Sequence, residues 1–239
     1  MSFYPVNLNI HKRFCLIIGG GEVAARKVEQ VLACGAKVAV ISPKACPRIR
    51  ELAAEGRMEW RRRDYCPGDL RGAFLVFAAT DKAEVQQQVI DEAKERDILL
   101  NSADNPEACT FQVPATVRQG ELLLAISTGG GSPAVAAWIR KRLEREFGPE
   151  YGVLVRLFSS IRGAVLGDGS SSWSHQLLFE KILEMDVLSC INREDWPALG
   201  ERLAGILPAT INAADLVADI TAGGNLTRTK TRGRALQDD

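Results

Sequence analysis

The chain has 239 residues, enough for one large domain or two smaller ones, each with its own core. Its 30 Lys and Arg residues balance 30 Asp and Glu residues, which argues against a general nucleic-acid or membrane-surface binder. We recognise no run of about 18 apolar residues and no secretory leader, so we expect a cytoplasmic protein that does not span a membrane.

Cysteine and histidine are sparse and scattered. The six cysteines include no C-x-x-C pair, and the two histidines lie far apart in the sequence. We therefore expect no stably bound metal ion. Cys15 falls in a predicted strand and Cys34 at a predicted helix end, so we interpret most of the cysteines as small core residues.

A glycine-rich turn follows the first apolar run, which predicts a strand over residues 15–18. In such a turn Gly19 permits the tight bend, and Gly21 lets the main chain approach a pyrophosphate closely. Ala24 is small enough for the following helix to pack against the strand, and the free N–H groups of its first turn point toward phosphates. The pattern predicts a Rossmann-like dinucleotide-binding domain, with a glycine-rich loop of another α/β protein as the alternative.

Strands and helices then alternate along the first hundred residues. The helix after the glycine turn is predicted to end at Gly35 in a left-handed cap. The later elements are a strand over 37–41, a helix over 46–54, strands over 58–62 and 74–79, a helix from 83 to about 96, and a strand over 98–101. This alternation is typical of a parallel sheet. The continuous apolar run over 74–79 indicates a strand that is covered on both faces.

The ends of these strands are predicted to border one crevice. Right-handed crossovers place the carboxyl ends of parallel strands along one edge, and ligands bind there where the strand order reverses. The residues predicted to contact the cofactor are Gly19, Gly20, Gly21, Glu22, Val23, Ser42, Pro43, Lys44, Ala79, Thr80, Asp81 and Asn101.

The second predicted strand is not followed by the usual acidic residue. Where Asp or Glu normally holds the adenosine ribose, this chain has Ser42, Pro43 and Lys44. Without a carboxylate, selection of NAD over NADP is not enforced. Lys44 is either a partner for a 2′-phosphate or a solvated surface lysine, and the sequence leaves both interpretations open.

The pattern changes past Phe111. A strand is predicted over 122–127, followed by a glycine-rich loop and a helix from Ala134 to about Phe147. Ser132 is suited to cap that helix and Pro133 to its first position. An apolar stripe on this helix, interpreted as a packing face, comprises Val135, Trp138, Ile139 and Leu143.

The remainder of the chain is predicted to be helical. From Tyr151 to about Ala222 the sequence indicates helices, interrupted by a Gly- and Ser-rich loop over 167–174. The polar stretch over 225–239 is interpreted as a disordered tail rather than a nucleic-acid arm.

Four sequence blocks together resemble the precorrin-2 dehydrogenase family, which includes the N-terminal module of siroheme synthase. The blocks span residues 19–27, 78–81, 101–104 and 127–133. The likeness runs from about Phe3 to about Gly163 and rests on helical character alone beyond that. No second glycine-rich methyltransferase module is recognised, so the chain resembles a stand-alone member.

This resemblance implies an enzyme that uses NAD to oxidise precorrin-2 to sirohydrochlorin. In some members the same site inserts ferrous iron into sirohydrochlorin to make siroheme. Members are homodimers that exchange the segment after the nucleotide-binding domain, and no nucleic acid or membrane is implied as a partner. The implied organisation is an NAD-binding domain over 1–112, a dimerisation segment over 113–148, a helical domain over 149–222 and a tail over 223–239.

The family's essential aspartate corresponds to Asp104. Oxidation releases a proton and iron insertion displaces pyrrole protons, so one carboxylate beside the ring can accept either. The alternatives are that Asp104 only orients the substrate, or that it is an ordinary turn residue before Asn105 and Pro106.

A second glycine-rich loop is a candidate for substrate binding. Its main-chain N–H groups can hold the carboxylates of a tetrapyrrole, while the alternative is a plain turn with a Ser cap. The predicted contacts are Ser127, Thr128, Gly129, Gly130, Gly131 and Ser132. The charge run over 61–64 is interpreted as a solvated strand edge.

A function of a different class is an NAD-sensing regulatory protein without turnover. The chain has no recognisable helix-turn-helix and no basic face, so little in the sequence favours this alternative.

Overall fold

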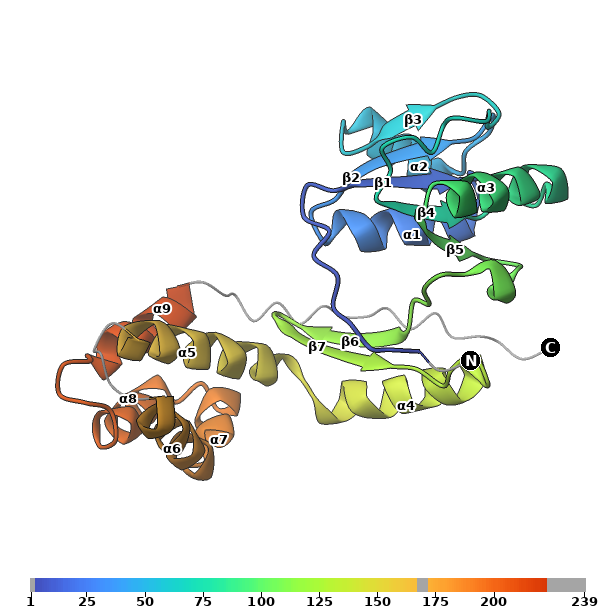
Figure 1. The fold of residues 1–239 in the computed structure, drawn as a ribbon. Helices are drawn as coiled ribbons and strands as arrows, with labels where there is room; N and C mark the ends of the chain where they lie inside the picture. The colour runs from blue at the N-terminus through green and yellow to red at the C-terminus, as the bar shows by residue number, and fades with distance from the viewer. Residues whose placement is uncertain (1–2, 167–171, 223–239) are drawn as a thin grey trace, which may run out of the picture. The chain divides into compact units, whose positions relative to one another are not determined.

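The computed structural model describes residues 3–166 and 172–222. The chain divides into two compact units, one ending at Val113 and the other beginning at Pro114 (Figure 1). No helix in the described ranges is both long and apolar enough to cross a membrane.

The first unit is a five-stranded parallel sheet with helices on both faces (Figure 1). The strand order is β3-β2-β1-β4-β5. The predicted elements are confirmed to within about a residue at each end. Their bounds are β1 (Phe14–Ile18), α1 (Glu22–Leu32), β2 (Lys37–Ile41), α2 (Pro47–Ala54), β3 (Glu59–Arg61), β4 (Leu75–Ala78), α3 (Ala83–Glu95), β5 (Leu99–Ser102) and the short 3-10 helix η1 (Pro106–Ala108).

Both faces of the sheet are covered, which explains its continuous apolar strands. Cys15 and Ile17 of β1 pack with residues of α1 and α2. Leu16 and Ile18 point the other way and pack with residues of α3 and of the β3–β4 connection. Because successive side chains of a strand alternate between faces, a strand buried on both sides must be apolar throughout.

The end of α1 follows the predicted cap. Gly35 has a φ of +72°, a conformation that favours glycine. The Gly35 N–H donates to the Leu32 carbonyl at 2.9 Å, and the Ala36 N–H donates to the Val31 carbonyl at 3.2 Å. These two bonds form a Schellman motif, which turns the chain directly into β2.

The strand order reverses beside β1. The chain runs outward from β1 through β2 to β3, then crosses back to β4 on the other side of β1. The carboxyl ends of β1 and β4 therefore lie at a topological switch point, where open α/β sheets bind their ligands.

The second unit begins with an antiparallel hairpin of β6 (Ala115–Gln119) and β7 (Leu122–Ile126). The prediction recognised β7 and missed β6. A two-residue turn of Gly120 and Glu121 was the available signal, since Gly in a two-residue loop indicates a hairpin. Only Val117 is buried in β6, so its hydrophobic alternation is too weak to mark a strand.

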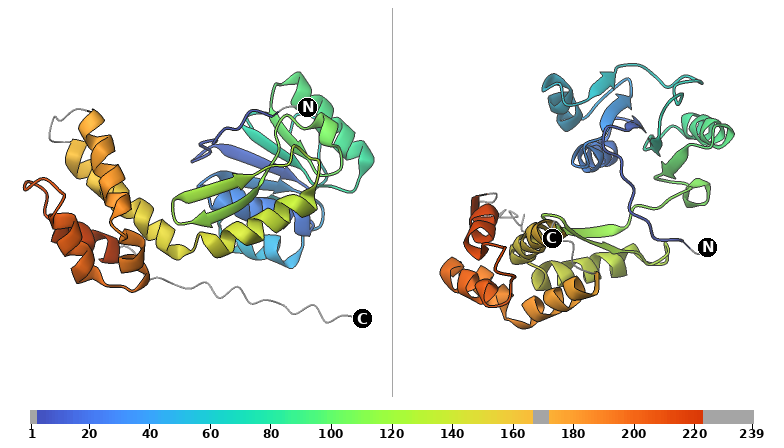
Figure 2. Two further views of the ribbon diagram at one scale, coloured as in Figure 1. Left: turned by 90° about the horizontal axis from the view of Figure 1, so that it is seen from below. Right: turned by 60° about the vertical axis from the view of Figure 1, so that its left-hand side comes forward.

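Helices make up the rest of the described second unit, as predicted. They are α4 (Pro133–Glu146), which packs on the hairpin, and α5 (Pro149–Leu166), α6 (Ser172–Glu184), α7 (Val187–Asn192), α8 (Trp196–Ala204) and α9 (Ala213–Ala222). Helices α5 to α9 gather in one group in the ribbon views (Figure 2). Leu157 and Ile161 of α5 are fully buried in the apolar core of this group.

The loop and the tail predicted for this part of the chain fall wholly or partly outside the described residues. Of the loop predicted over 167–174, residues 172–174 belong to α6, so that part was wrong, and residues 167–171 lie outside the described residues. The predicted tail also lies outside them.

The prediction that most cysteines lie in the core was wrong. Only Cys15 and Cys190 are buried, while Cys34 and Cys66 are exposed. Cys34 lies in a turn and Cys66 in an irregular stretch before one, and such connecting segments run along the surface of a protein. Burial, followed by the nearby Cys34 thiol, raises the pKa of Cys15 to about 11.

Candidate functional site

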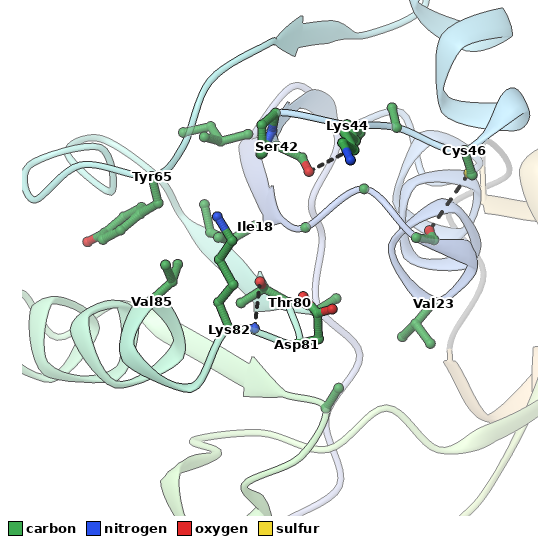
Figure 3. A pocket seen from close by; sticks show the side chains of 18 of the residues that line it. Ile18, Val23, Ser42, Lys44, Cys46, Tyr65, Thr80, Asp81, Lys82 and Val85 are labelled. Carbon is green, nitrogen blue, oxygen red and sulfur yellow. Dashed lines mark hydrogen bonds between the residues drawn. The ribbon is translucent and has the colours of Figure 1, made fainter.

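A cavity of about 900 Å³ lies at the carboxyl ends of β1, β2, β4 and β5 in the first unit (Figure 3). Asp104 and every predicted cofactor residue except Asn101 line it. The structure therefore brings together segments more than eighty residues apart in the sequence, as the sheet topology predicts. The lining residues that the sequence did not indicate include Ala45, Cys46, Asp64, Tyr65, Lys82 and Val85.

At two positions of the β1–α1 turn, neighbouring backbone atoms leave no room for a side chain, so glycine is required. Gly19 has a φ of +121°, and a Cβ there would lie 2.0 Å from the Ala79 carbonyl oxygen. A Cβ on Gly20 would lie 2.0 Å from the Lys44 carbonyl oxygen, and the Gly20 carbonyl accepts the Cys46 N–H at 2.7 Å. The turn is thus held between the segments that follow β4 and β2.

The third glycine is different, because it faces open space. A Cβ on Gly21 would meet nothing within 4 Å. Gly21 is the N-cap of α1 and has no side chain to cap the first-turn N–H groups. Ala24 is fully buried against the sheet, as predicted. An open approach to uncapped helical amides fits a bound diphosphate.

In the segment after β2, the Ser42 side chain is buried and bonds to its own turn. The Ser42 hydroxyl donates to the Lys44 carbonyl at 2.7 Å, and the Trp60 indole N–H donates to the Ser42 carbonyl at 3.0 Å. The Ser42 side chain therefore shapes its own turn. Lys44 is exposed, and no ion pair involves it in residues 3–166 and 172–222.

An ion pair lies at the edge of the cavity. Lys82, the N-cap residue of α3, approaches the Asp64 carboxylate to 2.6 Å. The hydrogen bond that Lys82 donates to the Asp64 carboxylate raises the pKa of Lys82. The charge run over 61–64 is largely a solvated edge, since β3 is an edge strand and Arg61 pairs with Glu59. The prediction missed that Asp64 lines the cavity.

At the end of β5, three neighbouring polar residues have different surroundings. The Asn101 amide donates to the Phe111 carbonyl at 3.2 Å and does not line the cavity. The Asn105 side chain accepts the Ala108 N–H at 3.2 Å and so caps η1. The Asp104 carboxylate is exposed in the cavity wall, and none of the hydrogen bonds or ion pairs of the described residues engages it.

Tyr65 is a lining residue that sequence reasoning missed. It is 7% exposed, and its hydroxyl donates to the Glu92 carboxylate. Burial, with the hydrogen bond to Glu92, raises the pKa of Tyr65. The two residues are 27 positions apart and lie in different elements, so no local pattern indicates the contact.

The Ser127–Ser132 loop belongs to the second unit. Its Ser132 hydroxyl accepts the Val135 N–H at 3.3 Å, which confirms the predicted N-cap of α4. Thr128 and Ser132 also bond to one another across the loop. Contact of this loop with a substrate stays a prediction. Within the described ranges, no three His, Cys, Asp or Glu side chains gather as metal ligands.

Two protein families match the chain. Residues 6–115 match a family described as "Putative NAD(P)-binding", and residues 119–146 match one described as "Sirohaem biosynthesis protein central". The first match covers nearly all of the unit that carries the cavity. It confirms the expectation of a nicotinamide dinucleotide cofactor.

Curated relatives are siroheme synthases. That of Methylobacillus flagellatus is 39% identical over 184 residues, covering 77% of this chain and 39% of the relative. That of Chromobacterium violaceum is 37% identical over 195 residues, covering 82% and 42%. That of Thioalkalivibrio sulfidiphilus is 34% identical over 217 residues, covering 90% and 44%. The chain spans about two fifths of the length of the curated relatives it matches.

A solved structure named "SirC, precorrin-2 dehydrogenase" has a similar fold. The TM-score is 0.68 at 25% identity, covering 92% of this chain and all of the other. The Rossmann-like fold with a helical C-terminal part is thereby confirmed. The structural likeness also extends past Gly163, beyond which the resemblance in sequence rested on helical character alone.

Proposed function

The chain belongs to the family of siroheme synthases and precorrin-2 dehydrogenases, and from that premise we propose that it oxidises precorrin-2 to sirohydrochlorin with NAD. One observation carries the proposal. An unengaged carboxylate, Asp104, lines the same cavity as the uncapped start of α1. A proton acceptor and a diphosphate-binding turn are thus available in one place.

The glycine turn and the segments beside it would hold the cofactor. Main-chain N–H groups at the start of α1 bind the diphosphate, with Gly21 leaving room for its approach. The end of β2 would face the adenosine half, and the end of β5, beside Asp104, would face the nicotinamide half. When bound, NAD supplies the hydride acceptor of the reaction.

Asp104 would take the proton. Oxidation of precorrin-2 breaks two bonds to hydrogen, one hydrogen leaving as a hydride with its electron pair and the other as a proton. The Asp104 carboxylate accepts that proton and, being exposed, passes it to solvent. Neither oxygen is committed to another group, so the carboxylate is free to rotate toward the ring.

Binding of the substrate and dimer formation complete the proposal. Precorrin-2 carries carboxylates around its rim, and main-chain N–H groups of the Ser127–Ser132 loop would bind some of them. In α4, Trp138 is 62% and Val135 47% exposed in the single chain. Exposed apolar side chains on one helix face support a homodimer formed through residues 113–148.

An anaerobic assay tests the proposal. Purified protein mixed with NAD and precorrin-2 should form NADH and sirohydrochlorin in equal amounts, both followed by absorbance. Protein that binds NAD and leaves precorrin-2 unchanged would contradict it and favour the regulatory alternative. Insertion of ferrous iron stays a prediction, tested by the rate of iron uptake by sirohydrochlorin with and without protein.

A further inference from the structure

The β3–β4 connection, residues 62–74, is anchored to α3 by a buried carboxylate that the proposed reaction does not use. Glu92 of α3 is 7% exposed. One of its oxygens accepts from the Tyr65 hydroxyl and from the Gly68 N–H at 2.8 Å, and the other accepts from Arg96 at 2.8 Å. Both ends of the stretch from Tyr65 to Gly68 are thereby fixed to one helix.

Further bonds hold the same stretch in place. Arg63 makes two hydrogen bonds of 2.6 Å to the Asp69 carboxylate, which also accepts the Cys66 N–H at 2.8 Å. Asp64 is paired with Lys82 at the start of α3. The connection is therefore held by bonds within itself and by bonds to α3, and it forms a fixed wall of the cavity rather than a loose surface loop.

The wall has one surface suited to a flat ring. Among the residues that the structure describes, Tyr65 is the one aromatic residue that lines the cavity. Val85 lines the cavity too and packs on the same apolar cluster as Tyr65 (Figure 3). Tyr65 follows the end of β3, which neighbours β2, and so lies on the side proposed for the adenosine half of a dinucleotide.

We propose that Tyr65 and Val85 contact the purine of the cofactor and that Glu92 is the positioning residue that holds Tyr65 for this contact. The inference rests on the proposed function. Aromatic rings stack on bases, and a ring held in place before binding loses less conformational freedom when the base arrives. Glu92 acts through Tyr65 and Gly68 and does not touch the cofactor.

Titration calorimetry of the full chain with NAD and with ADP tests the proposal. ADP keeps the purine and the diphosphate and lacks nicotinamide, so it isolates the purine end. We expect Glu92→Ala and Tyr65→Leu each to lower the affinity for both ligands about tenfold. Glu92→Gln, whose carbonyl still accepts the Gly68 N–H, should restore most of the affinity. Glu95→Gln, an exposed change in the same helix, is the matched control and should bind as the wild type does.

Kinetics separates positioning from a loss of folded protein. In Glu92→Ala the KM for NAD should rise about tenfold while kcat at saturating NAD stays within about twofold. Folded variants that bind NAD and ADP as tightly as the wild type, or a fall in kcat with an unchanged KM, would overturn the inference. If Glu92→Ala does not fold, the ADP affinity of Tyr65→Leu decides.

The two proposals fail in different ways. Wild-type protein that binds neither NAD nor ADP would defeat the proposed function. If the wild type binds NAD and oxidises precorrin-2 while the Glu92 and Tyr65 variants bind as tightly, only the proposed contact of Tyr65 with the purine is defeated.

Discussion

Two adjacent residues before Pro106 differ in what their side chains contact. The Asn105 side chain caps η1 through a hydrogen bond that stabilises the turn, whereas the Asp104 side chain makes no hydrogen bond within the described residues. The sequence could not separate these roles, because Asp and Asn are equally suited to turns. Since Asn105 already serves the turn, the structure favours a chemical role for Asp104.

We predict that Asp104→Asn lowers kcat at least about 100-fold, because the amide cannot accept the proton. The affinity for NAD and the free energy of unfolding should stay near their wild-type values. Rates of NADH formation at saturating substrates measure the effect. Glu107→Gln, an exposed neutralisation three residues away, is the control, and an Asp104→Asn enzyme as fast as that control would remove the proposed role.

The adjacent glycines of the β1–α1 turn should respond differently to alanine. Gly20→Ala places a methyl group against the Lys44 carbonyl and should cost about 1–3 kcal/mol of stability. Gly21→Ala meets no protein atom, so its stability should change by no more than about 1 kcal/mol.

The affinity for NAD distinguishes the two positions further. The Gly21→Ala methyl occupies the approach to the helical amides, so that variant should bind NAD at least about tenfold more weakly while remaining folded. Urea unfolding and calorimetry together measure both quantities. A Gly21→Ala protein with wild-type affinity would show that the diphosphate does not approach this turn.

At the scale of elements, Glu92 connects α3 to the β3–β4 connection and makes this contact dependent on pH. Burial acts to raise the pKa of Glu92, but hydrogen bonds from Tyr65, Gly68 and Arg96 together hold it below its ordinary value. A carboxyl with a depressed pKa in the folded state contributes stability that is fully present above its unfolded pKa, about 4.3. That stability is lost as the pH falls through the folded value.

The expected consequence is a pH-dependent difference between wild type and Glu92→Gln. Near neutral pH the wild type should be more stable by about 1–3 kcal/mol, because the charged carboxylate accepts three hydrogen bonds. At about pH 3 the difference should shrink as the carboxylate becomes protonated. Urea unfolding at both pH values checks this, and a difference that is constant with pH would contradict it.

A close approach of α5 to the β6–β7 hairpin gives another prediction for an element. A Cβ on Gly152 would lie 2.8 Å from the Gln119 carbonyl oxygen, whereas one on Gly163 would meet nothing within 4 Å. Gly152→Ala should therefore destabilise the protein by about 1–3 kcal/mol. Gly163→Ala, the matched change in the same helix, should stabilise it by up to about 1 kcal/mol. Thermal unfolding measures both, and equal effects would contradict the packing described.

At the scale of the whole molecule, the exposed face of α4 predicts association. If Trp138 lies at the centre of a homodimer interface, Trp138→Glu should shift the protein toward monomer and weaken the dimer at least about tenfold. Arg142→Ala, an exposed change in the same helix, should leave the association unchanged. Sedimentation equilibrium measures the dissociation constant, and a wild-type monomer would contradict the prediction.

Local signals determined much of this protein. The β1–α1 glycine turn, the apolar periods and the caps at Gly35 and Ser132 each depend on neighbouring residues, so the sequence predicted them correctly. The order of strands and helices also follows from local patterns, and sheet topology then placed the strand ends around one cavity.

Only the tertiary structure decided the rest. Three contacts join residues that are far apart in the sequence or in different elements. They are the bond of Tyr65 to Glu92, the ion pair of Asp64 with Lys82, and the bond of Asn101 to the Phe111 carbonyl. The strand β6 and the exposure of Cys34 and Cys66 likewise depend on what packs against each segment. Such contacts depend on how the folded chain packs, and no periodic pattern in the sequence indicates them.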